Sequence, residues 1–325
     1  MIAAAVLLTY AALAASVGAR TLRRWVWLQR HPRWGILAWQ TLGLTVLLAG
    51  LLSAVSLALP FLSLRFPLAD VIGVPPIALV EHYATPLDPW PGLIALTAVG
   101  VLLALTTVRL VRDARGLTSE RRAQRDQLML VGRRHPDGFI VVDHDTPVAY
   151  CLPRSARGGA PAVVVSSGAV DLLTVEERYL VLAHEARHLA GRHHLALTVA
   201  GTLARTFERI KVFPTALEQI TVLAEMDADD AARTPRERRA LASALVTLGC
   251  GARPQAALGA GDTAALQRVR RLVATEVAPR LNLGQGALVG LVASTILAIP
   301  LSIAMAPAIE TAVRQCCSLS VRPAS

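Results

Sequence analysis

Four long apolar runs divide the sequence, and each is close to the length that crosses a bilayer as a helix. They cover about residues 2–18, 35–59, 92–108 and 287–309. A spanning helix needs roughly 20 residues, so the first and third runs are at the short end. Arginines follow the first run and none precedes it, the reverse of the order in a cleavable signal peptide. The pattern predicts four transmembrane helices, the first of them a retained anchor.

Between the third and fourth runs, the pattern changes to that of a folded domain. Residues 112–283 are long enough to bury a core of their own. The β-branched and aromatic residues of 137–152 are interrupted by Asp-His-Asp-Thr-Pro and predict a hairpin, and 160–170 predict a further short strand.

Helical signals follow these strands. Thr174 and Glu177 have the spacing of a capping box and predict the start of a helix. A second helix is predicted from near Pro214 to before Pro235, and a third over 236–249. Residues 250–264 have the composition of a loop, and a basic amphipathic helix leads from there toward the last apolar run. Strands followed by helices predict an α+β fold.

The charged residues predict how the chain crosses the membrane. Hydrophobic residues form 54% of the chain and charged residues only 17%, which is typical of a protein with several spans. The 19–34 connection carries five arginines and no acid, 109–127 is also basic, and 60–91 is slightly acidic. Basic connections stay in the cytoplasm. We therefore expect 19–34 and the 112–283 domain inside, and 60–91 and both termini outside.

The net charge of +10 has two interpretations, a nucleic-acid surface or a set of topology signals. All five tryptophans lie beside or just within the ends of the predicted spans, where an amphipathic ring sits among headgroups. We therefore expect membrane lipid as a partner of the basic clusters and no direct nucleic-acid partner. Cys151 and Cys250 should be reduced, and the adjacent Cys316 and Cys317 are interpreted as incidental.

The helix that Thr174 opens contains the pattern His-Glu-x-x-His. His184 and His188 are four residues apart, so both rings project from one face and can share a cation. Two imidazoles suit zinc, and Glu185 can accept a proton from a metal-bound water. A chance match is the alternative, because only three positions are fixed.

A second motif, Glu-x-x-Ala-Asp, lies on a later helix. Glu225 would complete a His, His, Glu ligand set, leaving the fourth zinc position for water. Asp229, on the same face, could hold the free N–H of a ligand histidine and fix its tautomer. The alternative for this pair is a solvated acidic helix edge, but two partial patterns in the expected order favour a metal site.

These motifs carry a family resemblance. The order of the spans, "DHDTPVAYCLP", "VVVSSG", "LTVEERYLVLAHEARHLAGRHH" and "EMDAD" resemble the BlaR/MecR-type bacterial membrane metallopeptidases over most of the chain. The two metal motifs more distantly resemble the HtpX/Ste24-like peptidases. The resemblance implies a cytoplasmic gluzincin-like zincin domain in the bacterial cell membrane. It also implies His184, His188 and Glu225 as Zn²⁺ ligands, Glu185 as general base, and Asp229 as support for a ligand.

A rival interpretation comes from the longer string that continues to Gly191 and His194. In metzincins the glycine turns the chain, the third histidine is the third ligand, and a methionine turn follows. Met226 is the nearest methionine downstream, and it falls within a predicted helix. Metzincins are also typically secreted, so we favour Glu225 over His194.

The expected function is that of a zinc endopeptidase cleaving a cytoplasmic-side protein, by resemblance a DNA-binding transcriptional repressor. The alternatives are an HtpX-like quality-control protease and a non-catalytic zinc-binding scaffold. A second copy of the chain, in a homo-oligomer, is a further candidate partner. The chain ends at Ser325, soon after the fourth run. We therefore expect no external penicillin-binding sensor domain, and no β-lactam sensing. An extended substrate is expected to add to the sheet at Val163–Ser166, and no oxyanion stabiliser can be named.

Overall fold

The computed structural model describes residues 1–319 apart from 64, 73–74, 76, 78–79, 81–82, 84–89, 155–159, 252–260 and 275–282. Within these residues, four helices are long and apolar enough to cross a membrane. They cover Ile2–Arg24, Pro32–Phe61, Trp90–Leu128 and Gly284–Val313, so all four predicted runs are confirmed as long helices. The side chains of Cys250, Cys316 and Cys317 and most of the 73–89 segment lie outside the described set.

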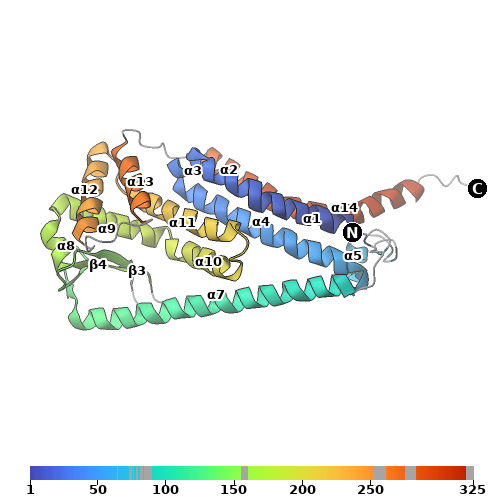
Figure 1. The fold of residues 1–325 in the computed structure, drawn as a ribbon, viewed down its shortest axis with the longest axis horizontal. Coiled ribbons are helices and arrows are strands. Elements are labelled where there is room, and N and C mark those ends of the chain that lie inside the picture. The colour runs from blue at the N-terminus through green and yellow to red at the C-terminus, as the bar shows by residue number, and fades with distance from the viewer. Residues whose placement is uncertain are drawn as a thin grey trace, which may run out of the picture.

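The long helices form an elongated bundle with the sheet at one end (Figure 1). Helix α1 (Ile2–Leu13) continues through a π-helical turn into α2 (Ala19–Arg24), and the short α3 (Val26–Arg30) leads into α4 (Pro32–Ala58). Helix α4 is central, since it packs against α1, α7, α11 and α14. The short helix α5 (Arg65–Ile72) lies at the opposite end from the sheet, and the final helix α14 (Leu283–Leu319) runs along α1 and α4 toward that end.

Helix α7 (Trp90–Val131) is much longer than the predicted third run. Its 42 residues span about 63 Å, roughly twice the thickness of a bilayer core. The apolar half is followed without a break by the basic residues of 109–127, which carry the chain to the sheet. The third span and the start of the predicted domain are therefore one continuous helix.

The sheet has four strands: β1 (Arg133–Arg134), β2 (Ile140–Val142), β3 (Ala149–Leu152) and β4 (Ala162–Ser166). Their order is β1-β2-β4-β3, with β2 parallel to β4 and the other pairs antiparallel. The predicted 137–152 hairpin is therefore wrong, because β4 lies between β2 and β3. The reason is burial. Val164 and Val165 point to opposite faces of the sheet and are both 1% exposed, so both faces of β4 are covered, as is typical of a central strand.

The position of β4 also corrects the expected substrate edge. Val163–Ser166 pairs with a strand on each side and has no free edge. The edge strand on that side of the sheet is β3, and among the strands it is the one that α9 contacts most.

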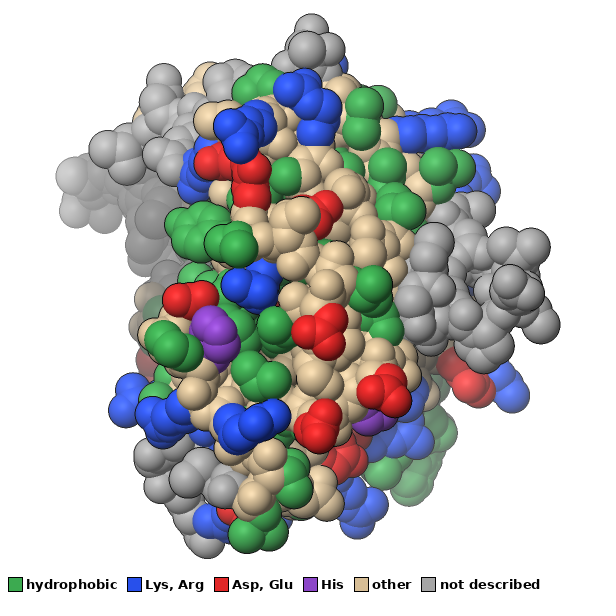
Figure 2. All heavy atoms as spheres, turned by 90° about the vertical axis from the view of Figure 1, so that its left-hand side faces the viewer, with side chains coloured by type: hydrophobic (Ala, Val, Ile, Leu, Met, Phe, Trp, Pro, Cys, Tyr) green, Lys and Arg blue, Asp and Glu red, His purple; other side chains and the backbone are tan. Residues whose placement is uncertain are grey.

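Among the described residues, six helices lie between the sheet and α14: α8 (Ser167–Leu172), α9 (Val175–Ala190), α10 (His193–Thr206), α11 (Val212–Asp229), α12 (Pro235–Gly251) and α13 (Gly261–Val273). The predicted capping box at the start of α9 is confirmed. The Glu177 N–H donates to Thr174 Oγ1 over 3.2 Å, and the Thr174 N–H donates to Glu177 Oε2 over 3.0 Å. The end of the molecule formed by the sheet, α8, α9 and α12 carries charged side chains of both signs (Figure 2).

Two cores position these helices. One lies under α9 and joins the sheet to α12 and α13 through residues such as Phe139, Leu180 and Leu241. The other joins α10 and α11 to the long helices, and Trp39 and Phe213, both 1% exposed, are among its members. The second half of the predicted domain therefore packs directly on α4.

Candidate metal centre

The centre is built on the middle of α9, where His184 and His188 face the same side. Their Nε2 atoms lie 3.2 Å apart. Two nitrogens, each about 2.0–2.1 Å from one zinc ion at a tetrahedral angle, would be about 3.3 Å apart. His184 is buried and His188 is half-buried. The pair therefore has the spacing of two ligands of one ion.

Glu225 on α11 completes the group. Its Oε2 lies 3.7 Å from His184 Nε2, and its Oε1 lies 3.5 Å from His188 Nε2. One ligand atom from each of these three residues lies within 4.8 Å of the others. Two imidazole nitrogens and a carboxylate oxygen are the donor set of a three-ligand catalytic zinc site. The residues therefore fit zinc by chemistry and by spacing.

Asp229 lies behind His184, one turn of α11 after Glu225. Its Oδ1 is 3.1 Å from His184 Nδ1, and its side chain is fully buried. Burial alone would disfavour the carboxylate, but Arg268 and His184 outweigh it and hold the pKa of Asp229 at about 2. The carboxylate thus favours a proton on His184 Nδ1 and leaves the Nε2 lone pair directed at the centre.

The two histidines differ in how they hold a proton. Burial opposes the charged form of His184, but Asp229 and Glu225 outweigh it and raise its pKa to about 9. Burial lowers the pKa of His188 to about 4. Without a metal, the site therefore contains one protonated and one neutral imidazole at neutral pH.

Glu185 points from α9 toward β3. The thiol and the main-chain N–H of Cys151 both form hydrogen bonds with its carboxylate. Burial is the main cause that raises the pKa of Glu185, and burial together with this carboxylate raises the pKa of Cys151 to about 12. Glu185 is therefore a stronger base than an exposed glutamate, and the thiol beside it stays protonated.

His194 does not join the centre. Within the described part of the chain, the group of potential ligands comprises His184, His188 and Glu225. Met226 lies inside α11 and is completely buried, as the helical spacing predicts. The neighbouring His193 instead contacts His188, with 2.9 Å between the two Nδ1 atoms.

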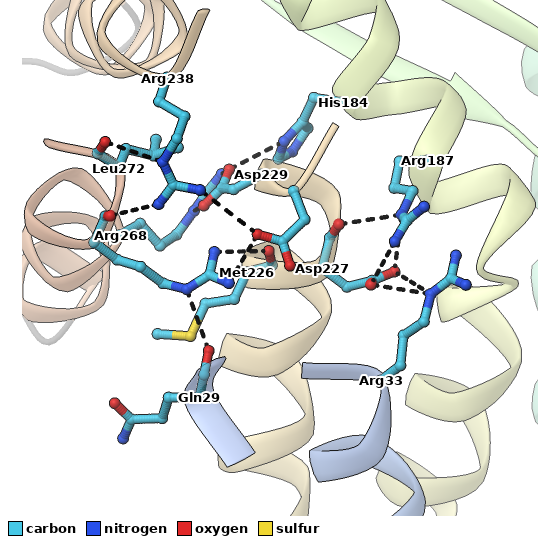
Figure 3. Close-up of polar contacts among 12 residues, drawn as sticks. Gln29, Arg33, His184, Arg187, Met226, Asp227, Asp229, Arg238, Arg268 and Leu272 are labelled. Carbon is cyan, nitrogen blue, oxygen red and sulfur yellow. Dashed lines mark hydrogen bonds and ion pairs between the residues drawn. The ribbon is translucent and has the colours of Figure 1, made fainter. Parts of the chain in front are cut away.

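The sequence did not predict two residues that lie at the centre, His193 and Arg268. Arg268 of α13 donates to Asp229 from Nε and Nη2 over 2.9 and 2.7 Å (Figure 3). Its Nη1 lies 2.8 Å from Glu225 Oε2. The predicted basic amphipathic helix is confirmed as α13 up to Val273, and its expected continuation over 275–281 lies outside the described residues. Arg268 points into the protein from this helix. Spacing carries no signal for a contact between residues 39 positions apart.

Comparison with known proteins finds a peptidase family that is similar to the part of the chain containing this centre. The model of "Peptidase family M48" matches residues 119–248, which include α9 and α11. This part of the chain is therefore similar to the M48 peptidases. It is also 34% identical over 82 residues to "Protease HtpX homolog" of Acidiphilium cryptum (strain JF-5).

That similarity covers 25% of this chain and 28% of the relative, so the match spans less than a third of either protein. No solved structure matches significantly. The M48 domain, the HtpX relative and the apolar helices together support a membrane metallopeptidase.

Proposed function

We propose that the chain is a membrane-embedded zinc endopeptidase. The convergence of His184, His188 and Glu225 inside the region that matches peptidase family M48 carries the proposal. Bound zinc would supply a Lewis acid that polarises the scissile carbonyl and lowers the pKa of a water molecule. The three ligands would hold the ion, and Asp229 would orient His184.

Glu185 would perform the proton transfers. Its carboxylate takes the proton from the attacking water and then donates it to the leaving amine nitrogen, so that one peptide bond breaks and one water is consumed. The raised pKa of Glu185 supports this role, because a base whose pKa lies nearer neutrality holds and releases a proton more readily.

The substrate would bind along β3. An extended peptide can add to an edge strand through main-chain hydrogen bonds. Arg125 of α7 already binds the carbonyls of Leu152 and Pro153 at the far end of this strand. The part beside Glu185, around Ala149–Cys151, would then hold the peptide next to the metal centre.

By the resemblance to BlaR/MecR-type enzymes, the substrate would be a cytoplasmic transcriptional repressor. The basic 19–34 and 109–127 segments support a cytoplasmic catalytic domain with both termini outside. The match to an HtpX homologue favours a second candidate, the removal of damaged membrane proteins.

The assay of this function uses the full chain purified in detergent and an unfolded protein substrate. Cleavage should occur with zinc, stop after chelation, and return when zinc is added back. A chain that binds zinc without cleaving anything would instead indicate a non-catalytic scaffold. Recovery of trapped proteins on Glu185→Gln would separate the two protease candidates, since one predicts a repressor and the other misfolded membrane proteins.

Zinc binding should depend strongly on pH. Below pH 9 the metal-free His184 is protonated, because its pKa is about 9, and zinc must displace that proton. The apparent affinity should therefore rise about tenfold per pH unit between pH 7 and 9, and level off above. Chelator competition at pH 7, 8 and 9, corrected for titration of the chelator, measures this slope. Asp229→Asn removes a main cause of the raised pKa and should flatten it, and a flat profile in the unsubstituted protein would contradict the assignment.

A further inference from the structure

Asp227 lies between Glu225 and Asp229 in sequence but faces a different set of partners. Its side chain is 2% exposed and accepts hydrogen bonds from two arginines of two other helices (Figure 3). Arg187 of α9 donates from Nε over 3.2 Å and from Nη2 over 3.0 Å. Arg33, at the start of α4, donates from Nε over 3.1 and 3.3 Å. A buried carboxylate held by two guanidinium groups remains ionised.

The third partner of Asp227 is His193, which is itself 3% exposed. His193 Nε2 lies 3.0 Å from Asp227 Oδ2, and His193 Nδ1 lies 2.9 Å from His188 Nδ1. One arrangement of the protons satisfies both contacts and leaves His188 Nε2 free for a metal. His188 Nδ1–H donates to His193 Nδ1, and His193 Nε2–H donates to the carboxylate.

The two histidine ligands would thus be supported in parallel ways. His184 has a buried carboxylate, Asp229, directly behind it at 3.1 Å. His188 has the carboxylate of Asp227 behind it through one intervening imidazole. Partners of this kind fix the tautomer and the orientation of a ligand ring.

The backbone before His193 is arranged to bring its ring into this position. A Cβ atom at Gly191 would lie 2.4 Å from His193 Nε2 and 2.8 Å from its Cδ2, so a side chain there would displace the ring. Arg192 has a φ of 49°, a left-handed conformation that is unfavourable for arginine. Gly191, which the metzincin interpretation assigned to a turn before a ligand His194, therefore makes room for His193.

The start of α4 is docked firmly on the helices that carry this network. A Cβ at Gly35 would lie 2.8 Å from Leu223 Cδ1, which shows how closely α4 approaches α11. Just before α4, the carbonyl of Gln29 accepts a hydrogen bond from Arg271 Nε of α13 over 3.2 Å. Arg33 is thus held beside Asp227 by the packing of a long apolar helix.

We propose that Asp227 and His193 are positioning residues for the ligand His188, and that Arg33 connects helix α4 to the metal centre through Asp227. This inference rests on the proposed function, because it takes His188 as a zinc ligand. Its consequence is that the geometry of the metal centre depends on an arginine at the head of a candidate membrane span.

The test measures zinc affinity by chelator competition and the visible absorption spectrum of the Co²⁺ form, with the full chain in detergent. Asp227→Asn removes the charge and keeps the shape. His193→Gln keeps an amide donor for Asp227 but removes the ring nitrogen that accepts from His188. Each should weaken zinc binding by about 10- to 100-fold and alter the Co²⁺ spectrum.

Arg33→Gln should weaken zinc binding by about two- to fivefold, because Arg33 is partly exposed and Arg187 still holds Asp227. In an Asp227→Asn background it should have no additional effect. Arg236→Gln is the matched control, since Arg236 forms a two-point ion pair with Glu176 on the surface. It should change neither affinity nor spectrum.

Several results would overturn the proposal. Zinc affinities within twofold of the unsubstituted protein for both Asp227→Asn and His193→Gln would do so. An undiminished effect of Arg33→Gln in the Asp227→Asn background would remove the connection to α4. Loss of the helical circular dichroism signal in both variants would assign the network to folding instead. If the unsubstituted chain itself binds no zinc, the proposed function fails, and that outcome is distinct from all of these.

Discussion

Glu185→Gln is expected to lower the rate of peptide cleavage by about 10²- to 10⁴-fold while bound zinc is retained. Glutamine keeps the shape of the side chain but cannot take a proton from water at neutral pH. The three proposed zinc ligands are untouched, so metal content measured by mass spectrometry should equal that of the unsubstituted protein. Turnover of an unfolded protein substrate gives the rate.

Glu176→Gln is the control for this substitution. It makes the same chemical change on the same helix, at a residue whose carboxylate pairs with Arg236 on the surface. Solvent screens such an exposed pair, so its loss should leave the fold intact and the cleavage rate of Glu176→Gln should be normal. Full activity of Glu185→Gln would exclude Glu185 as the general base, and equal losses in both variants would point to a general destabilisation of α9.

Replacing Glu225 by alanine is expected to weaken zinc binding by about 100- to 1,000-fold. Zinc sites with four ligands have binding free energies of about 10–16 kcal/mol, or roughly 2.5–4 kcal/mol per ligand, which corresponds to about this factor. The Glu225 carboxylate also pairs with Arg268, which keeps its bonds to Asp229 in the variant. The fold should therefore survive, and circular dichroism can verify it.

His194→Ala is the informative comparison, because His194 is the third ligand in the metzincin interpretation. The structure does not bring it to the group formed by His184, His188 and Glu225. The zinc affinity of the His194→Ala variant should therefore equal that of the unsubstituted protein. The opposite pattern, with zinc lost on replacement of His194 and kept on replacement of Glu225, would contradict the proposed site.

Some local features could be predicted because their cause lies within a few residues. The capping box of Thr174 and Glu177 formed as expected, since each group bonds to the main chain of the other over one turn. The shared face of His184 and His188 follows from the pitch of a helix. The four apolar helices follow in the same way from the length of each run.

Strand pairing was predicted incorrectly at β2 and β3, where neighbours in sequence were taken as neighbours in the sheet. β4 occupies the position between them because it is apolar on both faces. Which strands become neighbours depends on what covers each face of the sheet. The alternation of apolar and polar residues within one strand does not reveal this. The same error placed the expected substrate edge at Val163–Ser166, a strand that pairs on both sides.

The sequence by itself determined the four long helices, the helix that carries His184 and His188, and the pairing of this motif with a later acidic helix. Only the tertiary structure brought Arg268, His193 and Arg33 to the two buried aspartates behind His184 and His188. The physical reason is the range of the interactions. Helix periodicity and caps act over three or four residues, whereas a buried carboxylate is stabilised by whichever cation the packing of distant helices brings to it.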